Sequence, residues 1–131
     1  MTNQNFSQDN NLESVLDKAL RHFLDYAAGI LGEAKALEFL HESYQQTLNY
    51  YSPLSLLRYE QDAGLTLENG KISDKEILGF SLWMERFSKK LSDFMIGIGK
   101  IQPEEILAEL AEELKQLGFF EYYEHAGELG Y

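Results

Sequence analysis

Residues 74–99 read DKEILGFSLWMERFSKKLSDFMIGIG, and this stretch decides the fold. Its apolar residues recur at alternating steps of three and four, which places them on one stripe of an α-helix. The stripe consists of Ile77, Phe80, Met84, Phe87, Leu91, Phe94 and Ile98. Ser73-Asp74-Lys75-Glu76 has the pattern of a capping box, in which the two end residues bond to each other's backbone N–H groups. The pattern predicts a long helix from Ser73 to about Gly99.

Two helices are predicted before this stretch. Residues 11–31 carry a wide apolar stripe over more than five turns, and Gly32 is expected to end that helix in a left-handed cap. A second helix is predicted over Glu33–Tyr51, with an inner face made of Ala36, Leu37, Leu40, Tyr44, Leu48 and Tyr51. Ser52 and Pro53 form a cap and a first-turn proline, so a short helix is predicted to about Gln61.

The signal changes between Gly64 and Ser73. Two short apolar runs flank Asn69-Gly70, which is the strongest short-range signal for a hairpin turn. Each arm holds only about two residues, and an isolated hairpin is marginal in water. We therefore expect a hairpin-like loop near Asn69-Gly70 that packs on the helices through Leu65, Leu67 and Ile72.

The last part of the chain also predicts helices. Pro103 follows Gln102 at a first helical position, and Glu104 and Glu105 suit the positive end of a helix. That helix should run to Leu117 and stop at Gly118, and residues 119–126 predict one more short helix. The whole is an all-α bundle of four sizeable helices and one or two short ones. We expect one domain over residues 11–131, after a disordered polar tail over residues 1–10.

Composition narrows the range of functions. The formal net charge is −11, with 22 acidic residues against 11 basic ones. Binding to nucleic acid or to an anionic membrane requires the opposite balance, so neither partner is expected. No stretch approaches the roughly 20 apolar residues that span a bilayer, and residues 1–11 lack the features of a signal peptide. With no cysteine in the chain, a cytoplasmic location is expected.

Catalytic and metal-binding patterns are weak. Glu38 and His41 have the Glu-x-x-His spacing of di-iron bundle proteins, but that site needs the motif twice and two further glutamates. Neither His22 nor His125 lies in a zinc-ligand spacing, and no serine lies in a nucleophile elbow. We therefore expect no metal, no cofactor and no enzymatic activity.

Three features suggest contact with a protein partner instead. Residues 101–131 hold eight acids against one base, and a basic partner would suit the acidic side of this segment: Glu104, Glu105, Glu109, Glu112 and Glu113. Leu78 and Leu82 lie outside the main stripe and predict a covering surface, either the loop at 65–72 or a second copy of the chain. Phe119, Phe120, Tyr122 and Tyr123 are either a cap on the bundle or an aromatic docking segment.

The leading interpretation is a non-enzymatic regulatory or adaptor protein that acts through protein–protein contacts, as a homodimer or with a basic partner. The alternative is a helical sensory domain that binds a small apolar or aromatic ligand inside the bundle. The ligand pocket would then include Tyr44, Phe80, Trp83, Met84, Phe87 and Phe94, which otherwise form ordinary core.

Overall fold

The computed structural model describes residues 3–68, 72–95, 97, 99 and 101–129, and it is an all-α helical bundle with one small hairpin. The α-helices are α1 (Asn3–Leu31), α2 (Glu33–Tyr50), α3 (Asp74–Phe94), α4 (Pro103–Ile106), α5 (Ala111–Leu117) and α6 (Phe119–Leu129). Two 3-10 segments, η1 (Ser52–Leu56) and η2 (Ala108–Leu110), and two strands, β1 (Leu57–Glu60) and β2 (Gly64–Leu67), complete the described elements.

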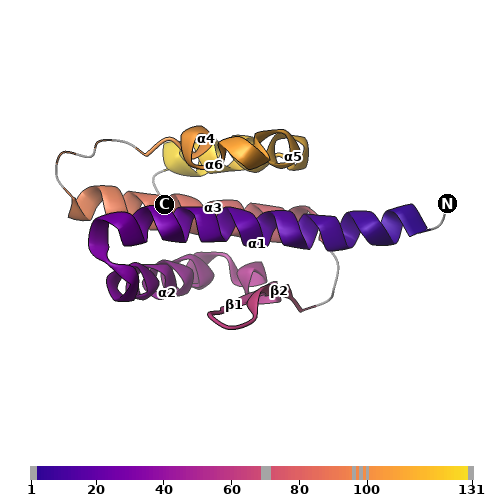
Figure 1. Ribbon diagram of the computed structural model, residues 1–131, viewed down its shortest axis with the longest axis horizontal. Helices are drawn as coiled ribbons and strands as arrows, with labels where there is room; N and C mark the ends of the chain where they lie inside the picture. Colours follow the sequence, from indigo (N-terminus) through magenta and orange to yellow (C-terminus); the bar gives the residue numbers. More distant parts are fainter. Residues whose placement is uncertain (1–2, 69–71, 96, 98, 100, 130–131) are drawn as a thin grey trace.

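The helices form three layers around α3 (Figure 1). α3 runs alongside α1, with α2 and the hairpin on one side of this pair and α4 to α6 on the other. The capping box that starts α3 is present, and the Ser73 N–H donates to Glu76 Oε1 at 2.5 Å. Buried residues lie on every side of α3, including Leu82, which is about opposite the predicted stripe. α3 is therefore the central element of the bundle.

The core is aromatic and lies where α1, α3 and α6 meet. Phe23, Phe80 and Phe119 are fully buried, and the Phe119 ring centroid lies 6.5 Å from that of Phe23 and 5.7 Å from that of Phe80. Trp83 is also buried, and its Nε1 donates to the Leu40 carbonyl at 3.1 Å, which joins α3 to α2. Tilted and edge-to-face rings stabilise each other beyond the area that they bury, so these contacts position α6 on α3.

The boundaries of α1 and α3 differ from the prediction. α1 begins at Asn3 rather than about Asn11, because no proline or glycine interrupts the segment and extending a helix costs less than starting one. The polar tail predicted over residues 1–10 thus overlaps this helix. α3 ends at Phe94 rather than Gly99, and Ile98 of the predicted stripe lies outside the described residues. Gly32 has φ +88° and ψ 158°, which is not the left-handed helical cap that the sequence suggested.

α2 is rotated relative to its predicted inner face. Its buried residues are Ala36, Phe39, Leu40, Ser43 and Thr47, whereas Leu37, Tyr44 and Leu48 are half-buried. Short polar side chains at two of these buried positions leave room for the helices around them, and the Ser43 hydroxyl donates to the Leu40 carbonyl at 2.9 Å. A hydrophobicity pattern places such residues on the outside, so the predicted face was wrong by part of a turn.

The hairpin lies earlier in the chain than predicted, because its first strand is formed by residues that were expected to end the short helix. The short helix ends at Leu56, and β1 then pairs with β2 in antiparallel register, Leu57 opposite Leu67 and Glu60 opposite Gly64. Burial alternates along β1, as a period-two strand pattern requires, and the turn lies at residues 61–63. The predicted turn at Asn69-Gly70 lies outside the described residues. The three anchors are confirmed, because Leu65 is buried and Leu67 and Ile72 pack against the core.

Two carboxylates of α1 bind the open edge of β2. The Leu65 N–H donates to Asp17 Oδ1 at 2.8 Å, and the Leu67 N–H donates to Glu13 Oε2 at 3.2 Å. These N–H groups have no partner on β1, so without α1 they would need water. The helix side chains therefore complete the hydrogen bonding of a two-stranded sheet that is too small to be stable alone.

The predicted helix over 103–117 is interrupted. It consists of α4, η2 and α5, with a change of backbone direction at Leu107, whose side chain is fully buried. No helix-breaking residue explains the change, so it reflects the packing of Leu107, Leu110 and Leu114 into one core. The predicted stop at Gly118 is confirmed, and this glycine ends α5 in a left-handed conformation with φ +84°.

Candidate functional site

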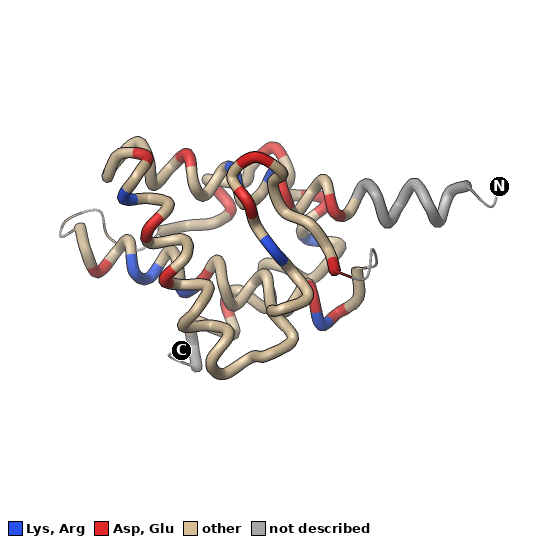
Figure 2. The backbone as a smooth tube through the Cα atoms, turned by 90° about the horizontal axis from the view of Figure 1, so that it is seen from below, with Lys and Arg blue, Asp and Glu red and all other residues tan. Residues whose placement is uncertain are grey.

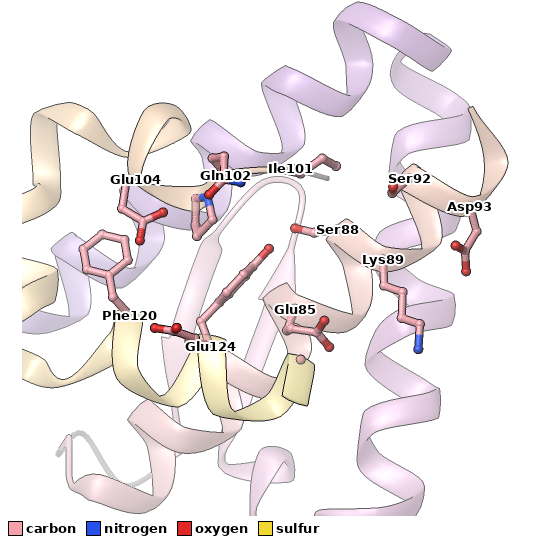
Figure 3. A pocket seen from close by; sticks show the side chains of 13 residues that line it. Glu85, Ser88, Lys89, Ser92, Asp93, Ile101, Gln102, Glu104, Phe120 and Glu124 are labelled. Atoms are coloured by element: carbon pink, nitrogen blue, oxygen red, sulfur yellow. The ribbon is translucent and has the colours of Figure 1, made fainter. Parts of the chain in front are cut away.

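A pocket of about 560 Å³ lies between α3, α4 and α6. Its size falls within the usual range for small-ligand and side-chain sites. Figure 3 shows side chains that line it from α3, from the segment at 101–104 and from α6. The lining residues are Glu85, Ser88, Lys89, Ser92, Asp93, Ile101, Gln102, Pro103, Glu104, Phe120, Tyr123, Glu124 and Gly127.

The lining is strongly acidic. It holds four carboxylates, from Glu85, Asp93, Glu104 and Glu124, against one ammonium group, from Lys89. Glu104 and Glu124 lie on the wall opposite Glu85, so the carboxylates flank the pocket from two sides (Figure 3). Charges of one sign across a concave site reinforce each other's field, so the pocket attracts cations.

Ser88 is a buried polar group in this lining. Its side chain points from α3 into the pocket (Figure 3), and the residue is only 4% exposed. The Ser88 and Tyr123 side chains are close enough to hydrogen-bond with each other.

Tyr123 forms the inner wall of the pocket and is 7% exposed. Its ring stacks on Phe23 with the centroids 6.2 Å apart. Burial raises the pKa of Tyr123, a hydrogen bond with the Ser88 side chain partly offsets the rise, and the charges of Glu85 and Glu104 add to it. The charges of two pocket carboxylates thus act on this phenol.

The positions of these groups follow from local sequence. Pro103 and the buried Ile101 hold the start of α4 against the bundle, which places Glu104 at the pocket. Gly127 lies beside Glu85, and a Cβ atom there would be 3.5 Å from Glu85 Oε2. A larger side chain would fill the space in front of that carboxylate, so the glycine keeps this end of the pocket open.

The predicted acidic surface shares Glu104 with the pocket. Glu104, Glu105, Glu109, Glu112 and Glu113 are all exposed. In the described part of the chain, none of the five pairs with Lys or Arg, and Glu109 lies 3.9 Å from His22 Nε2. Carboxylates also occur along the rest of the molecule (Figure 2), so the distinguishing feature of this segment is its lack of bases.

The surface expected around Leu78 and Leu82 is not present as predicted. Leu82 is 6% exposed and Leu78 is half-buried, because α3 is covered on both sides within the chain. The Leu82 side chain is therefore not available for a partner, and the loop at 65–72 is not needed to explain its burial. A contact of α3 with the C-terminal helices was not visible in the sequence pattern.

The aromatic segment is mostly core rather than docking surface. Phe119 is fully buried and Tyr123 nearly so, whereas Phe120 and Tyr122 are half-buried. The capping interpretation of residues 119–126 is the one that this burial supports. Both Phe119 and Tyr123 pack on Phe23, which leaves little of either side chain exposed.

The ligand pocket expected in the aromatic interior is filled by its own side chains. Phe80, Met84 and Phe87 are completely buried, and Phe94 is 53% exposed, outside the core. Tyr44 and Trp83 border a second pocket of about 210 Å³, but the Tyr44 hydroxyl donates to the Leu57 carbonyl at 2.8 Å. The larger pocket contains none of the six predicted residues.

The remaining candidates lie on the surface. Glu38 pairs with Lys35 at 2.9 Å, and His41 and His125 are exposed. Over the described ranges, no three His, Cys, Asp or Glu side chains are grouped so that they could hold a metal ion. Nor does any helix among the described residues have the length and apolar character needed to cross a membrane.

One signal for the pocket is present in the sequence. Ser81, Glu85, Ser88 and Ser92 recur at helical spacing and form a polar stripe beside the apolar one on α3. Such a stripe on a central helix indicates a polar contact or cavity, although not which element faces it. Comparisons with protein-family models, with curated proteins and with solved structures found no match to the chain.

Proposed function

We propose that the protein is a non-enzymatic regulatory or adaptor protein that binds a basic protein partner through its C-terminal helices. The observation that carries the proposal is the continuity of two acidic features. The exposed glutamates at 104, 105, 109, 112 and 113 form no ion pair with Lys or Arg among the described residues, and Glu104 also lines the acidic pocket. We call these five residues the acidic surface.

Electrostatic attraction between the acidic surface and the basic partner is expected to govern the association. Single surface charges contribute little to affinity, but a set of like charges raises the rate at which a basic partner associates. The field reaches about 8 Å at physiological ionic strength. Association with the partner should therefore slow as salt is added.

Self-association and location stay predictions. A homodimer remains compatible with the proposal, but its contact would have to avoid Leu82, since that side chain is buried within the chain. A cytoplasmic location rests on the absence of cysteine in the sequence.

The test compares two charge reversals of equal size. Glu109, Glu112 and Glu113 are changed to lysine in one variant, and Asp25, Glu60 and Asp62, which are exposed and far in sequence from the acidic surface, in the other. Both variants have the same net charge. Wild type and variants are used to capture partners from native lysate, and association rates of the captured protein are then measured over a salt series.

The variant with Glu109, Glu112 and Glu113 reversed should no longer capture the partner, and its association rate should depend little on salt. The variant with Asp25, Glu60 and Asp62 reversed should capture the partner with the salt dependence of the wild type. Equal effects of the two variants would mean that only net charge matters, and the proposed surface would be rejected. Retained capture by both variants would reject it as well.

The alternative function, a sensory domain, now has a different site. Four of the residues expected to line an apolar pocket, Phe80, Trp83, Met84 and Phe87, are fully buried in the packed core, which disfavours an apolar ligand there. The pocket between α3, α4 and α6 favours a cationic ligand instead, and a small molecule of that kind is the second candidate function.

A further inference from the structure

We propose that the smaller pocket, between α2 and β1, binds a neutral cyclic amide, a small molecule whose ring carries an N–H group beside a carbonyl. The pocket has a volume of about 210 Å³ and is lined by His41, Tyr44, Gln45, Arg58, Tyr59, Glu60 and Trp83. It shares no residue with the larger pocket or with the acidic surface, so the inference is independent of the proposed function. The observation that carries it is a free pair of backbone groups on the edge of β1.

The hydrogen bonds of the hairpin show which backbone groups point outward. The Glu68 N–H donates to the Leu56 carbonyl at 2.8 Å, and these two residues continue the register of the strands. Bonded and non-bonded pairs alternate in an antiparallel ladder, so the pairs 58/66 and 60/64 are the bonded ones. The N–H and C=O groups of residues 57 and 59 on β1, and of 65 and 67 on β2, therefore point away from the partner strand.

Three of these four outward N–H groups are bound within the protein. The two on β2 donate to the carboxylates of α1, and the Leu57 N–H donates to the Leu54 carbonyl. The fourth N–H belongs to Tyr59, and no described residue pairs with the N–H or the C=O of that residue. Tyr59 thus presents a free donor and a free acceptor at the outer edge of β1.

This edge borders the pocket. Tyr59 lines the pocket, and so does Tyr44, whose hydroxyl donates to the outward Leu57 carbonyl at 2.8 Å. Because both outward groups of Leu57 are already bound, a peptide strand added here would pair with β1 at Tyr59 alone. Residues of α2 form the opposite wall, and the space is smaller than the roughly 300 Å³ at which ordinary ligand sites begin. The pocket therefore suits a small molecule rather than an added strand.

The free pair of groups specifies one edge of the ligand. The N–H and C=O of an extended residue point to the same side, and in a bonded antiparallel pair they meet the C=O and N–H of the opposite residue. A cyclic amide carries the same two groups side by side, with the donor facing the Tyr59 carbonyl and the acceptor facing its N–H. Both bonds can then form at once.

The rest of the lining favours a ring without charge. Trp83 is 1% exposed and closes the inner end of the pocket, where its ring meets that of Tyr44 edge to face at 4.9 Å. These rings provide an apolar contact for a ligand ring. Arg58 and Glu60 contribute one charge of each sign, and Arg58 is paired with Glu68 at 3.2 Å. The lining thus has no excess of either charge.

The test uses 2-pyridone, a neutral ring with an N–H beside a carbonyl, as the probe. It is titrated into the ¹⁵N-labelled protein while the amide resonances are followed by NMR. The Tyr59 amide would bond to the probe directly, so its resonance should shift most. The matched probe is 1-methyl-2-pyridone, which keeps the ring and the carbonyl but has no N–H. Its Kd should be about tenfold higher, the effect of losing one hydrogen bond.

Acetamide separates a cyclic amide from the amide side chain of a protein partner. It has the same donor and acceptor as 2-pyridone but no ring, and it represents the side chain of asparagine. Acetamide should bind more weakly than 2-pyridone, because it makes no ring contact with Tyr44 and Trp83.

Two tryptophan substitutions on α2 locate the binding. Gln45 lines the pocket, whereas Gln46 is exposed and does not belong to the lining. Gln45→Trp fills the space opposite β1 and should raise the Kd for 2-pyridone about tenfold, while Gln46→Trp should change it less than about twofold. Circular dichroism of both variants should show the helical content of the wild type.

Several outcomes would overturn the inference. Equal binding of 2-pyridone and its methyl derivative would show that the N–H donor is not recognised. Acetamide binding as tightly as 2-pyridone would assign the pocket to an amide side chain instead. An unshifted Tyr59 amide, or a Gln45→Trp variant that binds like the wild type, would place the probe elsewhere. None of these measurements involves the basic partner, so this inference and the proposed function can fail separately.

Discussion

At the scale of single residues, the position most constrained by its surroundings is Gly64, the first residue of β2. Its φ is +78°, a conformation that other residues rarely adopt. A Cβ atom there would lie 2.6 Å from Asp17 Oδ1 and 2.9 Å from Arg21 Nη2. These two side chains are paired with each other at 3.0 Å, and Asp17 also holds β2, so neither is free to move.

Gly64→Ala is therefore expected to destabilise the protein by about 1–3 kcal/mol, the range for backbone strain of this kind. The control is Gly29→Ala on α1, where nothing lies within 4 Å of the new methyl group. That change should be neutral or stabilise by up to about 1 kcal/mol, because alanine favours helix. Urea unfolding of both variants measures the difference. Equal stability of the two would contradict the described geometry of the turn.

Tyr123 predicts a pH dependence at the alkaline end. Burial raises its pKa in the folded protein above the value in the unfolded chain, about 10. The unfolded state therefore loses its proton first, and stability falls as the pH rises above about 10.

Tyr123→Phe should reduce this alkaline loss of stability, although Tyr44, Tyr51 and Tyr59, whose pKa values burial also raises, keep part of it. Thermal unfolding of wild type and variant at several pH values from 8 to 11 measures the slope. An unchanged slope in the variant would show that Tyr123 is not buried from solvent in the folded state.

At the scale of elements, the sequence predicts local features and misses those set by contacts. The capping box at Ser73, the first-turn proline at 103 and the stop at Gly118 were correct, because each depends on residues within one turn. The pairing of β2 with β1 was not predicted, because the strongest turn signal, Asn69-Gly70, lies on the other side of β2. The pairing also depends on α1, whose carboxylates bind the other edge of that strand.

The same reason limits prediction of the site. Glu104 was a candidate because it lies in an acidic segment, but the pocket exists only because α6 packs on α3. Ser88 on α3 and Tyr123 on α6 are 35 positions apart in the sequence. No local sequence pattern predicts that two residues so far apart are neighbours in the fold. The polar stripe on α3 predicts a polar contact or cavity on that face of the helix, but it does not identify the element that packs there.

The link between α1 and the hairpin gives a test at this scale. Asp17→Ala removes the acceptor of the Leu65 N–H, so we expect a loss of about 1–3 kcal/mol and faster hydrogen exchange at Leu65 than at amides in the centre of α3. Asp25→Ala, at an exposed position on the same helix, is the control and should change stability by less than about 0.5 kcal/mol. Slow exchange at Leu65 in the Asp17 variant would show that β2 does not depend on α1.

At the scale of the whole molecule, the net charge of −11 on 131 residues opposes compaction. Salt screens this repulsion, and the exposed carboxylates of residues 104–113 contribute to it without compensating bases nearby. The same charge that would attract the proposed basic partner thus lowers the stability of the free protein.

We therefore expect the melting temperature to rise with sodium chloride between 0.02 and 0.5 M, an interval over which the screening length falls several-fold. The triple reversal at Glu109, Glu112 and Glu113 changes the net charge from −11 to −5, because each substitution adds two positive charges. The melting temperature of this variant should therefore rise clearly less with salt than that of the wild type. A melting temperature that ignores salt in the wild type would mean that repulsion has no measurable effect on stability.

The hydrogen bond from Trp83 to the Leu40 carbonyl gives the protein an internal optical reporter. Trp83 is the single tryptophan of the chain, and it is 1% exposed between α2 and α3, with the Tyr44 ring 4.9 Å away. An indole in such surroundings emits at shorter wavelength than one in water. The emission maximum therefore follows the separation of α2 from α3, whereas helical circular dichroism follows all helices together. A mismatch between the two signals during unfolding would reveal that the N-terminal layer opens before the rest of the bundle.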